Sequence, residues 1–266
     1  IIQNVSKNLE GTDIKFAVYL FDDTLQSHLF DFPVYSFEEV LEIGSKRKFK
    51  NIEIDNDSPA TIIYSSGTTG EPKGIVLSYE NLLSQIRNFH PVIGLKTGKR
   101  ALSILPIWHA YERTCEYYLL SCGTKIVYTN VRNFKKDIKK YQPHYIVSVP
   151  RLWEALYDGI MSEVNKQPYY KKKMFEFFLD ISKRYKKSLR VLNRTCINRQ
   201  NPSYPELLIE MVNVILLSSV HNFADKLLYR KLRRAISKSF IKGISGGGAL
   251  ARHLDDFFEA IGLDIV

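Results

Sequence analysis

Hydroxyl side chains, glycines and a lysine gather in one short stretch of the sequence, residues 64–74. It reads Tyr-Ser-Ser-Gly-Thr-Thr-Gly-Glu-Pro-Lys-Gly, with two serines, two threonines and two glycines ahead of Lys73. Glycines let backbone amides approach an anion, hydroxyl groups donate hydrogen bonds to phosphate oxygens, and a lysine brings a mobile positive charge. The stretch therefore predicts a binding site for a polyphosphate.

The flanking residues predict a strand on each side of this stretch. Residues 60–64 and 74–78 are apolar runs of β type, so the whole is a strand–loop–strand. The P-loop of common nucleotide hydrolases needs Gly-Lys-Ser/Thr at the start of a helix, whereas Lys73 is followed by Gly74 and a strand. The alternative without chemistry is a solvent-exposed hairpin loop rich in small residues.

A second group of candidate residues follows a strand predicted over residues 100–105. Pro-Ile-Trp-His comes directly after it, so Trp108 and His109 lie at the carboxyl end of that strand. Ligands usually bind beyond the carboxyl ends of strands in α/β sheets. The structural alternative is that the two rings cap the core.

A third candidate is the glycine-rich turn at residues 245–250. It joins a strand predicted over 240–244 to a helix predicted over 253–261, and three consecutive glycines let a flat ligand approach bare backbone. The sequence is not the Gly-x-Gly-x-x-Gly dinucleotide pattern. A tight strand-to-helix turn is the alternative explanation.

These three stretches together resemble the adenylate-forming, or AMP-binding, superfamily. Residues 105–117 look like its long-chain branch, which activates fatty acids onto coenzyme A or acyl carrier protein, and the run 108–113 resembles the acyl-carrier-protein enzymes most. The resemblance implies a ligase that uses ATP and Mg²⁺ to form an acyl-adenylate and then a thioester with coenzyme A. The alternative acceptor is acyl carrier protein.

The resemblance also implies a role for individual residues. It makes Lys73 and His109 catalytic, places Trp108 and His109 in the acyl pocket, and gives Glu112 and Arg113 an ion-pair or positioning role. The hydroxyls of Ser65 and Thr68 are candidate Mg²⁺ ligands. The predicted phosphate-binding residues are Ser65, Ser66, Gly67, Thr68, Thr69, Gly70 and Lys73, and those beside adenine and the acyl-adenylate are Gly246, Gly247 and Gly248.

Strand and helix patterns alternate along most of the chain and predict an α/β fold. The expected architecture is layered mixed or parallel sheets with helices on both faces, and residues 1–266 would form part of the large N-terminal domain of an acyl-adenylate-forming enzyme. Ser36 and Glu39 form a capping box for a short helix over 36–43. A helical insertion is expected over about 165–225.

The insertion combines basic helices with an apolar run over residues 207–220. This run has 14 residues, fewer than the roughly 20 that a membrane-spanning helix needs. Basic helices beside an apolar one suit peripheral contact with an anionic membrane surface. The alternatives are an insertion packed on the body of the protein and a docking surface for an acidic carrier protein.

Bulk composition narrows the partners and the compartment. A net charge of +10 and a pI near 9.3 indicate an anionic partner such as ATP, a carrier protein or a membrane. No nucleic-acid-binding motif is found in the sequence, so nucleic acid is not expected. Three cysteines without metal-ligand spacing or a disulfide framework favour a reducing, intracellular compartment, cytoplasmic or plastid-like.

Several parts of the complete family pattern are not found in these residues. They are the Tyr-Gly-x-Thr-Glu motif, the later ribose-binding Asp, the hinge and the small C-terminal domain with its catalytic Lys. We therefore expect an interior fragment of a longer enzyme, inactive by itself. Competing hypotheses are a non-catalytic lipid- or membrane-binding module on the same fold, and a simple ATPase.

Overall fold

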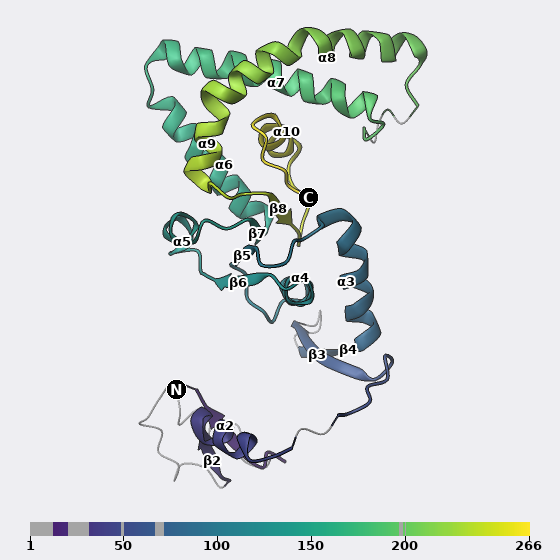
Figure 1. Ribbon diagram of the computed structural model, residues 1–266, viewed down its shortest axis with the longest axis vertical. Helices are drawn as coiled ribbons and strands as arrows, with labels where there is room; N and C mark the ends of the chain where they lie inside the picture. Colours follow the sequence, from purple (N-terminus) through teal and green to yellow (C-terminus); the bar gives the residue numbers. More distant parts are fainter. Residues whose placement is uncertain (1–12, 21–31, 49–50, 67–71, 197–198, 200) are drawn as a thin grey trace. The chain divides into compact units, whose positions relative to one another are not determined.

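The computed structural model describes residues 13–20, 32–48, 51–66, 72–196, 199 and 201–266. The chain divides into two compact units, residues 1–54 and 55–266. Figure 1 shows the elements of both.

The described part of the first unit is a small parallel strand pair followed by a helix. Strand β1 (Ala17–Tyr19) pairs with β2 (Val34–Ser36), and helix α2 (Phe37–Ser45) follows directly. Ser36 Oγ accepts a hydrogen bond of 3.1 Å from the Glu39 amide, and the Glu39 carboxylate accepts one of 2.7 Å from the Ser36 amide. The predicted capping box is confirmed.

The second unit alternates strands and helices. Its elements in chain order are β3 (Pro59–Ser66), β4 (Pro72–Ser78), α3 (Tyr79–Ile93), β5 (Arg100–Ser103), α4 (Ala110–Ser121), β6 (Lys125–Tyr128), α5 (Phe134–Tyr141), β7 (Tyr145–Ser148), α6 (Pro150–Asn165), α7 (Tyr169–Leu192), α8 (Tyr204–Ala224), the π-helical turn η3 (Asp225–Tyr229), α9 (Arg230–Ile236), β8 (Lys242–Ser245) and α10 (Arg252–Ala260).

Four of these strands form one parallel sheet in the order β6-β5-β7-β8. Side chains of a strand alternate between faces, and here both faces are buried. Leu102 and Ile146 pack into a cluster with residues of α6, α7 and α10, whereas Ala101 and Tyr145 pack with residues of α3 and α4. The predicted α/β sheet with helices on both faces is confirmed.

The hairpin β3–β4 is a separate antiparallel pair. Its strands extend further into the polyphosphate stretch than predicted, because backbone pairing continues to Ser65 opposite Lys73 and to Ser66 opposite Pro72. Residues 67–71 lie outside the described part of the chain. The strand–loop–strand prediction is confirmed for both flanks.

The segment predicted as a helical insertion consists of α7 and α8, which pack against each other. Helix α8 continues through η3 into α9, so a single helical run covers Tyr204–Ile236. By length and composition alone, this run could cross a membrane. The argument from the sequence, that the apolar run 207–220 is too short to cross a membrane, therefore does not hold, because the helix that contains this run is longer than the run itself.

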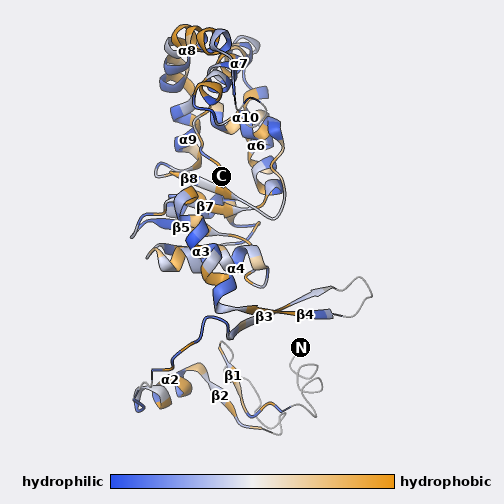
Figure 2. Cartoon of the chain, turned by 90° about the vertical axis from the view of Figure 1, so that its right-hand side faces the viewer, coloured by the Kyte–Doolittle hydropathy of each residue, from blue (hydrophilic) through white to orange (hydrophobic). Residues whose placement is uncertain are grey.

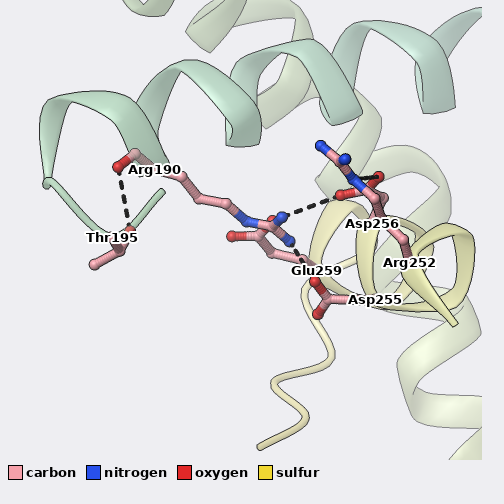
Figure 3. Close-up of polar contacts among 6 residues, drawn as sticks. All are labelled: Arg190, Thr195, Arg252, Asp255, Asp256 and Glu259. Carbon is pink, nitrogen blue, oxygen red and sulfur yellow. Dashed lines mark hydrogen bonds and ion pairs between the residues drawn. The ribbon is translucent and has the colours of Figure 1, made fainter. Parts of the chain in front are cut away.

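One arginine anchors α7 to α10 (Figure 3). The guanidinium of Arg190 lies 3.1 Å from carboxylate oxygens of both Asp255 and Asp256, and 2.5 Å from Glu259. The three acidic residues lie within about one and a half turns of α10. The Arg190 side chain is 25% exposed, so these ion pairs are partly shielded from water.

Replacing Arg190 by methionine is expected to lower the free energy of unfolding by about 1–2 kcal/mol. The change keeps the packing of the aliphatic stem but leaves three neighbouring carboxylates without their shared cation. Arg184→Met is the matched control on the same helix, because its pair with Asp180 is exposed and should contribute less than about 0.5 kcal/mol. Urea unfolding measures both, and equal losses would contradict an anchoring role for Arg190.

Candidate functional site

The carboxyl ends of three adjacent parallel strands create the candidate site. Strands β5, β7 and β8 end at Ser103, Ser148 and Ser245, and the register aligns their ends at one edge of the sheet. The Trp108–His109 stretch follows β5 and the glycine-rich turn follows β8. The sheet therefore brings two of the three predicted groups to a common edge.

Tyr111 connects these two groups directly. It lies in the first turn of α4, and its hydroxyl is 3.3 Å from the carbonyl oxygens of both Ser148 and Ile244. Its ring occupies the space beside Gly246, where an added Cβ would lie 2.1 Å from ring atom Cε2. Gly246 is therefore required by packing against the protein itself.

Burial raises the pKa of the Tyr111 phenol, and neighbouring Cys115 and Glu112 raise it further. The phenol consequently stays protonated and can donate a hydrogen bond at neutral pH. Sequence reasoning gave Tyr111 no role. The available signal was its place two residues after His109, in a helix that starts beyond the carboxyl end of a strand.

The other two glycines have different structural reasons. Gly247 has φ +75°, a left-handed conformation that side chains other than glycine rarely adopt. Gly248 is exposed, and a Cβ there would meet only Pro150 at 3.8 Å. Bare backbone is thus available to a ligand at Gly247 and Gly248, and their assignment to the adenine side stays a prediction.

Trp108 and His109 lie exposed at the start of α4. His109 is the N-cap residue of α4, and its side chain makes no capping hydrogen bond. Its ring centroid is 6.2 Å from that of Trp108, a residue that is 66% exposed. The alternative that these rings cap the core of the unit is wrong, and both rings are free to contact a ligand.

Arg113 links this stretch to the polyphosphate hairpin. Its guanidinium donates to the Ile107 carbonyl at 3.1 Å and to Thr61 Oγ1, on β3, at 2.5 Å. Glu112 points instead into the core and accepts a hydrogen bond from Ser103. Among the described residues, neither Glu112 nor Arg113 forms an ion pair, and the contacts of Arg113 agree with the positioning role.

The described part of the hairpin leaves its predicted phosphate-binding residues exposed. Ser65 and Lys73 lie opposite each other on β3 and β4, and both are exposed. Gly67, Thr68, Thr69 and Gly70 lie outside the described residues, and only the backbone of Ser66 is described. Within the described ranges, no hydrogen bond or ion pair joins Lys73 to His109 or to the glycine turn.

A Mg²⁺ ion fits this hairpin only if bound phosphates supply some of its ligands. No group of three metal-binding side chains (His, Cys, Asp or Glu) occurs among the described residues. Ser65 offers one exposed hydroxyl, and Thr68 lies outside the described part. Mg²⁺ commonly keeps several water ligands and is shared between few protein groups and substrate phosphates, so a single hydroxyl is compatible with it.

Sequence reasoning also missed Ser245. Its Oγ is buried and finds no hydrogen-bond partner among the described residues. It lies in a cavity of about 390 Å³ beside the glycine turn, lined also by Leu250, Arg252, Asp255, Ile265 and Val266. A second cavity, of about 320 Å³, is lined in part by Leu95 and Thr97, before the amino end of β5, and so lies away from the candidate site.

Two buried glutamates of α4 connect the first half of this helix to the end of strand β5. Glu112 and Glu116 are one helical turn apart, and both carboxylates accept from the Ser103 hydroxyl. Tyr128 donates to the second oxygen of Glu116 at 3.3 Å. Burial raises the pKa of Glu112 to about 7, the Ser103 hydrogen bond opposes this shift, and the charge of Glu116 adds to it.

The fold is similar to that of solved adenylate-forming enzymes. The structure is similar to the A-PCP didomain of a carboxylic acid reductase from Segniliparus rugosus in complex with AMP, with a TM-score of 0.59 and 17% identity over 94% of this chain and 32% of that one. It is also similar to the N-terminal domain of FACL13 from Mycobacterium tuberculosis, with a TM-score of 0.52 and 14% identity over 99% of this chain and 52% of that one.

The sequence matches the AMP-binding enzyme family over residues 9–266, and the chain belongs to this family. It is 40% identical to a probable acyl-activating enzyme 16, chloroplastic, of Arabidopsis thaliana, over 88% of this chain and 34% of the relative. It is 37% identical to a long-chain-fatty-acid–[acyl-carrier-protein] ligase, AEE15, of the same plant, over 94% of this chain and 37% of the relative. The chain thus spans about a third of the length of these relatives.

Replacing Gly246 by alanine is expected to lower the free energy of unfolding by about 2 kcal/mol or more, because the new methyl group overlaps the Tyr111 ring. Gly248→Ala, two residues along the same turn, is the matched control and should change it by no more than about 0.5 kcal/mol. Thermal or urea unfolding measures both variants. Equal stability of the two would contradict the close packing of Tyr111 on Gly246.

Replacing Glu112 by glutamine is expected to change how stability depends on pH. The pKa of this carboxyl rises from 4.5 to about 7 on folding, so the folded protein binds the proton more tightly. The resulting stabilisation is complete below pH 4.5, declines as the pH rises, and is lost above pH 7. Relative to the glutamine variant, the wild type should lose up to about 3 kcal/mol between those limits. Urea unfolding at several pH values tests this, and parallel curves would contradict it.

Proposed function

We propose that the complete protein activates a long-chain fatty acid with ATP and transfers the acyl group to the thiol of coenzyme A. The observation that carries the activation of a long-chain fatty acid is the chain's membership of the AMP-binding enzyme family together with its 37% identity to a long-chain-fatty-acid ligase. Coenzyme A as the acceptor is supported by 31% identity, over 78% of this chain, to a long-chain-fatty-acid–CoA ligase of Mycobacterium tuberculosis. The sheet edge supports it, because it offers an exposed aromatic–histidine pair and a bare glycine turn joined by Tyr111.

The first step joins two anions, and so charge neutralisation and positioning dominate its barrier. A carboxylate oxygen of the acid attacks the α-phosphorus of ATP, and the bond to the departing pyrophosphate breaks. Hydroxyls and amides of the hairpin would hold the β- and γ-phosphates, and Lys73 would neutralise the leaving pyrophosphate. Mg²⁺, with Ser65 and Thr68 as candidate ligands, would neutralise phosphate charge when bound.

His109 and Trp108 would place the carboxylate of the acid. Both lie exposed at the start of α4, where the amino end of a helix favours negative charge. Arg113 would keep this stretch in a fixed relation to the hairpin through its contacts with Ile107 and Thr61. Gly246, Gly247 and Gly248 would border adenine, with Gly246 also fixed by Tyr111.

Acyl carrier protein is the second candidate acceptor. The 37% identity to a plant acyl-carrier-protein ligase favours it, and the net charge of +10 suits an acidic protein partner. Turnover of the complete protein with coenzyme A and with acyl carrier protein, at equal thiol concentration, distinguishes the two. Two chloroplastic relatives favour an intracellular, plastid-like location.

The proposal includes peripheral contact with a membrane, because long-chain acids partition into lipid. A non-catalytic lipid-binding module on the same fold is the competing hypothesis. It predicts lipid binding by the complete protein without any nucleotide chemistry.

The test is fatty-acid-dependent exchange of pyrophosphate into ATP by the complete protein. Lys73→Ala is expected to lower the rate at least about 100-fold, because the charge that stabilises the leaving pyrophosphate is lost. Lys125→Ala, which removes an exposed lysine from β6, is the matched control and should stay within about twofold of the wild type. A wild type without exchange, or an unimpaired Lys73→Ala variant, would contradict the proposal.

A further inference from the structure

Helix α8 presents a long apolar stripe to solvent. Its exposed large side chains recur at helical spacing, three and four residues apart, so they lie on one face of the helix. They continue over about two and a half turns and are Leu208, Ile209, Met211, Val212, Ile215 and Leu216. Figure 2 shows this helix coloured as hydrophobic at the end of the second unit.

The opposite face of α8 is occupied by the protein itself. This face of α8 packs along α7, and a buried chain of hydrogen bonds joins the two helices. His221 Nδ1 lies 2.9 Å from Ser182 Oγ, which lies 2.9 Å from the Tyr229 hydroxyl. The ring of Tyr185 stacks on His221 at 4.6 Å. This polar network fixes the rotation of α8, so the apolar stripe faces outward because of the fold.

The neighbouring helix supplies positive charge. Helix α7 carries eight lysines and arginines against two acidic residues, a net of +6. Among the described residues, no ion pair is found for Lys171, Lys183, Lys186 or Lys187. Five more cations and one aspartate follow α8 in η3 and α9.

We infer that α7 and α8 form a docking surface for an anionic lipid membrane, with the α8 stripe inserted at the interface and the cations of α7 facing the head groups. Charge complementarity selects this occupant, since an apolar stripe beside a helix of net charge +6 matches an anionic apolar boundary. A second copy of this chain would instead bring two strongly basic helices together.

The same contacts favour lying on the membrane over crossing it. A span would place α8 in the hydrocarbon, and α7 packs along it. The charged side chains of α7 cannot enter the hydrocarbon with α8, because burying each charge in the hydrocarbon core costs free energy. The helical run Tyr204–Ile236 is long enough to cross, but its packing against α7 leaves only one face for lipid.

Binding of the complete protein to phosphatidylcholine vesicles, with and without about one third phosphatidylglycerol, tests this surface. Ile215→Glu should lower the partition coefficient at least about tenfold, because it puts a charge in the stripe. Val131→Glu is the matched control, since Val131 is 75% exposed and Ile215 is 64% exposed, and it should change partitioning less than about twofold. Ile215→Ser repeats the test without adding charge.

The role of α7 is measured with Lys171→Gln and Lys187→Gln. Each should lower binding to the anionic vesicles about fivefold at low salt and should leave binding to neutral vesicles unchanged. Equal binding to both vesicle types, or lysine variants without effect, would overturn the charge-based part of the inference.

Three further outcomes would overturn the surface itself. The first is that Ile215→Glu binds vesicles as well as the wild type does. The second is that the wild type self-associates and does not bind vesicles, and that Ile215→Glu abolishes the self-association. The third is that alkaline carbonate fails to extract the protein from membranes, which would indicate a span. This inference deepens the membrane contact proposed above but does not require catalysis. With the fatty acid supplied in solution, pyrophosphate exchange should be the same for Ile215→Glu and the wild type. Absence of exchange in the wild type would therefore contradict the proposed function and leave the membrane inference standing.

Discussion

The ring of Tyr111 occupies the space that a side chain on residue 246 would need, and its hydroxyl reaches the backbone of two neighbouring strands. This contact fixes the start of α4 against the carboxyl ends of β7 and β8. Because parallel strands align their carboxyl ends at one edge, the exposed Trp108–His109 pair and the open backbone at Gly247 then belong to one site. The position of the proposed acyl and adenine sides relative to each other depends on this packing.

The polyphosphate hairpin is held to that site in a different way. The guanidinium of Arg113 bonds Thr61 on β3 and the Ile107 carbonyl ahead of His109, and β4 continues directly into α3, which packs against α4. A buried contact thus positions the sheet-edge part of the candidate site, and the Arg113 side chain together with the packing of α3 on α4 positions the hairpin.

Buried polar groups mark the places where the fold cannot be varied freely. Glu112 and Glu116 share the Ser103 hydroxyl beneath α4, and Ser182 joins His221 to Tyr229 between α7 and α8. Buried polar groups need partners of defined geometry. These two networks therefore fix the rotation of the helices that carry the exposed pair at the sheet edge and the apolar stripe.

The sequence by itself determined the class of the fold, the hairpin around residues 64–74 and the capping box at Ser36, because strand periodicity, glycine content and capping depend on residues near in sequence. The tertiary structure alone decided that Gly246 faces Tyr111, that Arg113 bonds Thr61, and that α8 turns its aliphatic residues to solvent. The partners in the first two contacts are 135 and 52 residues apart, and the direction of α8 follows from its packing on α7. Only the packing of distant segments can set such contacts, since local preferences carry no information about them.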